Sequence, residues 1–113
     1  MFNNCSSLLY FNLKSFKNSS TNSTMEYMFN NCKSLISMDL SFFNTSYSTN
    51  IKGIFNNCIS LKNLKLLNFD ASSVSEFSHM FNNCTSLTSL DYQILINYQL
   101  VIIWNICFII VLI

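Results

Sequence analysis

Four of the five cysteines are the best candidates for metal-binding or reactive residues in this chain of 113 residues, by their type and spacing. They occupy one position of a repeated pentapeptide, as Cys5, Cys32, Cys58 and Cys84. Zinc sites need thiolates that converge on one point, often through C-x-x-C pairs, and the sequence contains no such pair. Equivalent positions of a repeat protein lie in a row. The spacing therefore favours packed, reduced thiols over disulfides or zinc, and no metal or cofactor is expected.

The single histidine, His79, and the glutamate Glu76 are the candidate acid–base residues. His79 precedes an apolar position and is expected on the solvated side of a helix, with no nucleophile or carboxylate placed beside it. Glu76 pairs with Ser73 in the spacing of a capping box at a helix N-terminus. No catalytic residue is predicted, and the chain is expected not to be an enzyme.

One outward-facing row of polar residues forms the tentative ligand face. It consists of Asn12, Asp39, Lys65 and Asp91, which share one position of the repeat. Stacked parallel strands would place them roughly 4.8 Å apart, with Lys65 between two carboxylates. Two interpretations stay open: a surface ion-pair row of small energetic value, and a face that binds a ligand.

Composition excludes several classes of partner. The formal net charge is +1, only 10% of the residues are charged, and all six basic residues are lysines, so no nucleic-acid partner is expected. Gly53 is the only glycine and proline is absent, which excludes a glycine-rich phosphate loop.

The elements that must position these residues belong to four tandem copies, which start at positions 1, 28, 54 and 80. The shared pattern is M-F-N-N-C-x-S-L-x-x-L-x-L-x-x-F. Its L-x-x-L-x-L segment is typical of the strand of a leucine-rich repeat. One strand per copy is expected, and the four form a parallel sheet. Their predicted ranges are Leu8–Leu13, Leu35–Leu40, Leu61–Leu66 and Leu87–Tyr92.

The segments between the strands are expected to be helical. Val74, Phe77, Met80, Phe81 and Cys84 are spaced along one helical face, and the earlier copies show the same spacing. The Asn-Asn pairs would end these helices, because asparagine tolerates a left-handed backbone, and stacked asparagines can bond in a row. The predicted fold class is α/β repeat: a short leucine-rich-repeat solenoid over residues 1–93, with a parallel sheet on one face, short helices on the other and an apolar C-terminal helix.

The second copy, residues 28–46, resembles the BspA-type leucine-rich-repeat surface proteins of bacteria and protists. It reads M-F-N-N-C-K-S-L-I-S-M-D-L-S-F-F-N-T-S. The resemblance implies a non-enzymatic surface or interaction protein that binds a protein or cell-surface ligand, located at the cell surface or membrane. The resemblance implies no catalytic residue in this chain.

Residues 94–113 break the pattern and carry no charge. Their length matches the ~20 residues of a helix that spans a bilayer, so membrane contact through Ile94 to Ile113 is one expectation. A mistranslated intron or frameshift and a buried cap are the other two interpretations.

The alternative interpretation is that the chain is a fragment or degenerate gene copy of a longer repeat protein and has no independent function. No signal peptide precedes the repeats, since Met1 stands in register with Met28 and Met80. The first copy also lacks a polar cap, which repeat proteins need at their ends.

Overall fold

A computed structural model describes residues 2–14, 24–42 and 45–90 of the chain. Four short strands form one parallel sheet in sequence order: β1 (Tyr10–Asn12), β2 (Ser37–Asp39), β3 (Asn63–Lys65) and β4 (Ser89–Leu90). Each lies inside a range that the L-x-x-L-x-L pattern predicts. The register pairs equivalent positions, so that Phe11 faces Met38 and Met38 faces Leu64.

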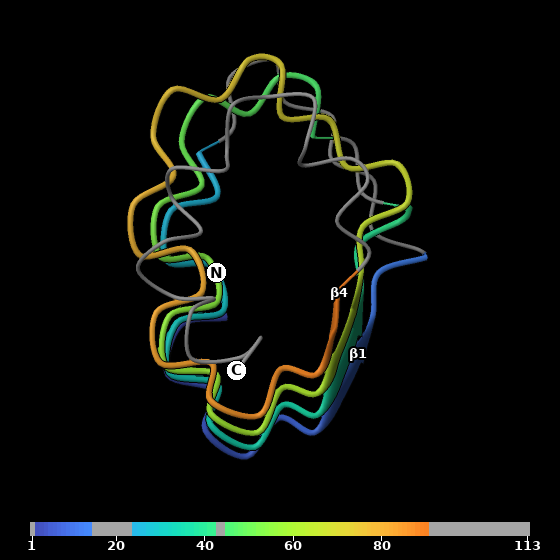
Figure 1. Ribbon diagram of the computed structural model, residues 1–113, viewed down its shortest axis with the longest axis vertical. Helices are drawn as coiled ribbons and strands as arrows, with labels where there is room; N and C mark the ends of the chain where they lie inside the picture. Colours follow the sequence, from blue (N-terminus) through green and yellow to red (C-terminus); the bar gives the residue numbers. More distant parts are fainter. Residues whose placement is uncertain (1, 15–23, 43–44, 91–113) are drawn as a thin grey trace.

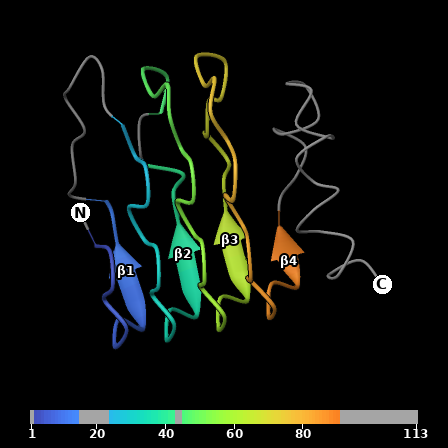
Figure 2. The same cartoon turned by 90° about the vertical axis from the view of Figure 1, so that its left-hand side faces the viewer.

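Each copy of the sequence forms one coil of a stack. We number the coils 1 to 4 and count the turns that precede a strand with that strand, so that coil 2 begins at residue 24, coil 3 at residue 50 and coil 4 at residue 76. Viewed along the stack, the coils superpose around a common interior (Figure 1). Viewed from the side, the four strands stand in a row (Figure 2). No coil can bury its apolar side chains alone, and stacking joins them into one core.

The core consists of rows of equivalent residues. Phe2, Phe29, Phe55 and Phe81 stack nearly parallel, with ring centroids 5.4, 5.6 and 6.1 Å apart. The inward strand residues Met38 and Leu64 and the leucines that flank the strands, such as Leu35 and Leu61, are buried beside this row. Because each core position packs against the equivalent position of the next coil, which holds the same residue or another apolar one, the repeat itself supplies the packing partners.

The segments opposite the strands are not helical, and the predicted second face of short helices is wrong. The described residues contain no helix of any kind. Residues 2–5, 24–32, 50–58 and 76–84, which we call the turn column, form successive tight turns. Within coil 2, the amide of Met28 bonds to the carbonyl of Met25, Asn30 to Tyr27 and Cys32 to Phe29, each across three residues.

Left-handed residues explain why these turns do not continue as a helix. Coils 2 to 4 each have two residues with positive φ: the first is Tyr27, Gly53 or His79, and the second is Asn31, Asn57 or Asn83. In coil 1, Asn4 has positive φ. A left-handed residue redirects the next amide, and alternate amides instead bond across to the following coil. The N–H groups of Phe29 and Asn31 donate to the carbonyls of Ile54 and Asn56, at 2.9 and 2.8 Å. The apolar spacing that suggested a helical face fits these turns equally well.

The asparagine pairs form two hydrogen-bonded ladders. The amide nitrogen of Asn30 donates to Asn3 at 3.0 Å, and Asn56 and Asn82 continue that ladder at 2.8 Å per step. A second ladder joins Asn4, Asn31, Asn57 and Asn83 at 2.8, 2.9 and 3.0 Å. Asparagine is suited to both tasks, because it accepts a left-handed backbone and carries both a donor and an acceptor.

The predicted capping box is also wrong. The Ser73 hydroxyl donates to the Ser46 carbonyl of the preceding coil, and the Glu76 carboxylate accepts from the Ser78 amide. Glu76 thus closes a turn two residues ahead, as Asn50 does at the equivalent position of coil 3.

The predicted apolar helix and membrane segment fall on residues 94–113, outside the described residues. The described ranges hold no helix with the length and apolarity that a membrane crossing requires.

Candidate ligand-binding face

The structure brings three of the four predicted ligand-face residues into one row. Asn12 pairs with Asp39, and Asp39 with Lys65, at successive strand ends. Asp91, the fourth, lies outside the described residues. We call the outward side chains of β1 to β3 the strand face; they are Tyr10, Asn12, Ser37, Asp39, Asn63 and Lys65.

Two residues of this row also have a structural task. The side-chain oxygen of Asn12 accepts a hydrogen bond from the Lys14 amide, and that of Asp39 accepts one from the Ser41 amide, both at 2.9 Å. This is an Asx turn, which bends the chain away from the strand. Lys65 has no acceptor, so coil 3 leaves its strand without this bond. The sequence did not reveal this role, because it depends on the side-chain rotamer.

The carboxyl group of Asp39 remains charged at neutral pH. Partial burial works toward a higher pKa, but the hydrogen bonds from Ser41 and the charges of Lys65 and Lys14 outweigh it, and the pKa falls below its ordinary value. The effect of Lys65 is the attraction expected between neighbours of opposite charge in the row. The strand face therefore carries a fixed negative charge between two positive ones.

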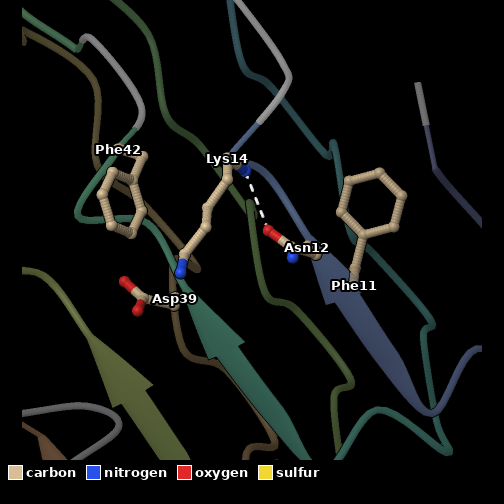
Figure 3. A pocket seen from close by; sticks show the side chains of 5 residues that line it. All are labelled: Phe11, Asn12, Lys14, Asp39 and Phe42. Carbon is tan, nitrogen blue, oxygen red and sulfur yellow. Dashed lines mark hydrogen bonds between the residues drawn. The ribbon is translucent and has the colours of Figure 1, made fainter.

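A pocket of about 200 Å³ opens where coils 1 and 2 leave their strands. Its lining consists of Phe11, Asn12, Lys14, Asp39 and Phe42. The Lys14 side chain runs between Asp39 and Phe42, with its ammonium nitrogen 5.3 Å from the centre of the Phe42 ring (Figure 3). A cation, an anion and an aromatic ring thus line one small open hollow. Such a set suits a ligand that has both polar and apolar parts.

Lys14 and Phe42 are site residues that the sequence analysis missed. Both lie just beyond the L-x-L strand motif, at positions where the four copies differ in residue type. That variation, next to an otherwise repeated motif, was the available signal. Large exposed side chains occur nearby: Tyr10 on β1 is 66% exposed and Phe42 is 56% exposed. Exposed aromatic rings are common in protein-binding surfaces.

The four cysteines of the repeat form the expected row of free thiols, and three of them have a specific hydrogen-bond partner. Cys32, Cys58 and Cys84 donate to the phenylalanine carbonyls of the preceding coil, at 3.1, 3.1 and 3.0 Å. Burial raises the pKa of the Cys32 and Cys58 thiols, so the reactive thiolate is disfavoured. The described residues contain no cluster of three or more side chains that could hold a metal ion. The thiols of Cys32, Cys58 and Cys84 therefore join neighbouring coils.

His79 is exposed, as expected, but on a turn rather than a helix. Its φ of 58° shows that it fills the left-handed position of coil 4, where coil 3 has Gly53. Its side chain is not directed into the pocket, which lies at the other end of the stack in coils 1 and 2.

Comparisons with known proteins give one match. Neither the curated proteins nor the solved structures include a match to this chain. Residues 1–99 match a protein family described as "Mycoplasma protein of unknown function, DUF285". The match covers all four coils and most of the chain, and the chain therefore belongs to that family.

Proposed function

We propose that the chain is a non-enzymatic interaction protein of the BspA-like repeat type, which binds a protein or another cell-surface ligand through its strand face. The pocket between coils 1 and 2 carries this proposal. It places the ammonium group of Lys14, the carboxylate of Asp39 and the ring of Phe42 on one accessible surface.

The distribution of residue types supports a binding role. The phenylalanine and asparagine rows, which contact the next coil, keep one residue type. The strand face instead changes from coil to coil: Asn12, Asp39 and Lys65 share one position and differ in charge. A surface with a different side chain at each step can recognise an extended ligand, which is how many repeat proteins use their strands.

The thiol environment supports a non-enzymatic role. The most reactive side chains of the described residues are the cysteines, and those of coils 2 to 4 are buried with their thiols bonded to carbonyls. A nucleophilic cysteine needs access and a lowered pKa, whereas burial raises it here.

The proposal is tested by probing peptide and glycan arrays with the purified chain. We expect a defined subset of array ligands to bind, and Lys14→Ala and Phe42→Ala to weaken that binding about tenfold, the loss of one good contact. Lys33→Ala is the matched control, because Lys33 is exposed outside the strand face. Binding that survives both substitutions would exclude the pocket. Absence of any array ligand would favour the alternative of a copy without independent function.

A further inference from the structure

The pocket between coils 1 and 2 is too small to enclose a whole ligand. Its volume is about 200 Å³, whereas sites that enclose a small molecule usually measure about 300–1,000 Å³. A hollow of this size holds one side chain or the end of a longer molecule. A protein ligand of the strand face would therefore place a single residue in the pocket, and the lining indicates which kind of residue fits.

The ammonium group of Lys14 is the open charged donor of the pocket. It carries three N–H groups, and no described residue accepts a hydrogen bond from them, since the bond from Lys14 to Asn12 is donated by the backbone amide. The Asp39 carboxylate already accepts the Ser41 amide at 2.9 Å. The charges of Lys14 and Lys65 also act on this carboxylate. On this part of the described surface, two ammonium groups thus stand against one carboxylate, which favours an anionic ligand group.

An aromatic wall lies beside this donor. The Phe42 ring is 56% exposed, and its centre is 5.3 Å from the Lys14 ammonium nitrogen (Figure 3). Phe11, which is half-buried, adds a second ring to the lining. An anion that accepts a hydrogen bond from Lys14 lies close to these rings, so the apolar carbons that contact the rings have to begin next to the anion. The charge and the apolar group therefore fit on one residue of the ligand.

The last residue of a polypeptide meets both conditions, because its α-carboxylate and its side chain leave the same carbon atom. An internal aspartate or glutamate has a carboxylate but no apolar side chain beside it. We propose that the pocket binds the C-terminal residue of a partner polypeptide, one with an apolar side chain. Lys14 binds the carboxylate through charge-assisted hydrogen bonds, and the rings of Phe42 and Phe11 contact the side chain. This inference rests on the proposed function of the strand face and specifies the part of the ligand that the pocket recognises.

NMR titration of the full chain with matched peptides tests the proposal. The probe is the peptide GSGSAF with a free C-terminal carboxylate, and its control is the same peptide with a C-terminal amide. We expect the free acid to bind at least about tenfold more tightly, because the amide lacks the charge that Lys14 contacts. The free acid GSGSAS, which lacks the ring, should bind about tenfold more weakly than GSGSAF. An amide that binds as tightly as the acid would overturn the proposal, and so would equally tight binding of the amide of GSGSDF, whose carboxylate is internal.

Two variants of the chain should change the binding of the free acid in opposite directions. Lys14→Ala should weaken it about tenfold. Asp39→Asn should strengthen it about threefold, because it removes a repelling charge and keeps the turn-closing oxygen, as Asn12 shows. Asp70→Asn is the matched control, since Asp70 closes the same kind of turn with the Ser72 amide outside the pocket, and binding should not change. Reversed directions for Lys14→Ala and Asp39→Asn would indicate a cationic ligand group and overturn the proposal.

Failure of this proposal is distinguishable from failure of the proposed function. Array ligands without a free C-terminus whose binding depends on Lys14 and Phe42 would overturn the C-terminal recognition and leave the binding role of the strand face intact. Absence of binding by every array ligand and by GSGSAF would remove both.

Discussion

The turn column and the strand face are formed by the same repeats, but residue types recur from coil to coil in the first and vary in the second. In the turn column, the asparagines and phenylalanines recur in all four coils, and each bonds to or stacks on its own equivalent. On the strand face, the outward positions carry different side chains, and solvent or a pocket surrounds them. In these two sets, the residues that bond to or stack on their equivalents are identical, and the exposed residues vary.

The residues that stabilise the stack and the residues proposed to bind a ligand therefore lie on different parts of each coil. The strands are only two or three residues long, so their ladder contributes few hydrogen bonds. The turn column adds backbone bonds, two asparagine ladders and thiol bonds between the same coils. We therefore expect substitutions that interrupt contacts between coils to have large effects on folding, and substitutions on the strand face to affect stability only slightly and binding more.

The largest effect is expected for Leu64→Asp. Leu64 is the inward residue of β3 and is 2% exposed, so a carboxylate there would lack both water and a partner. The cost should exceed about 4 kcal/mol and abolish cooperative thermal unfolding, measured by circular dichroism. The control is Asn63→Asp, one residue away on the exposed side, which should change stability by less than about 0.5 kcal/mol. A cooperative melt for Leu64→Asp would contradict the fold.

Cysteine substitutions compare an internal rung with the first rung. Cys58→Ala removes a buried sulfur and its bond to the Phe29 carbonyl, and should lower the free energy of unfolding by about 1–3 kcal/mol. Cys5→Ala, in the half-buried first coil, should cost less than about 1 kcal/mol in chemical denaturation. Equal losses in the free energy of unfolding for Cys58→Ala and Cys5→Ala would show that the thiol bond to the preceding coil adds no stability.

Gly53→Ala tests the left-handed turn position. Gly53 has a φ of 57°, and an added Cβ would overlap the ring of Tyr27. We expect a loss of about 1–2 kcal/mol, moderated by movement of that ring. The reverse change at the equivalent position, His79→Gly, should leave stability unchanged or raise it by up to about 1 kcal/mol. A stabilised Gly53→Ala variant would argue against the turn geometry.

The smallest effect concerns acid stability through Asp39. Because the pKa of its carboxyl is lowered in the folded chain, its contribution to stability is complete above the ordinary aspartate pKa of about 3.9. That contribution is lost as the pH falls through the lowered folded value. Asp39→Asn keeps the turn-closing oxygen, as Asn12 shows, and should flatten the acid limb of stability measured against pH. An unchanged acid limb would mean that neither the hydrogen bonds from Ser41 nor the charges of Lys65 and Lys14 lower the pKa of Asp39.

The sequence by itself determined the period, the positions of the strands, the buried rows and the left-handed asparagines. Alternation in L-x-L and recurrence of Phe, Cys and Asn at fixed intervals are local signals that survive in any stack of coils. The sequence also indicated the row of Asn12, Asp39 and Lys65, because equivalent positions of a repeat must align.

Only the tertiary structure decided between turns and helices, because the apolar spacing of the return segments fits both. The choice depends on amides that bond to the next coil instead of four residues back, and no local pattern records that partner. The pocket has the same origin. Lys14 and Phe42 belong to different coils and come together only when coil 2 stacks on coil 1, since the site exists between repeats rather than within one.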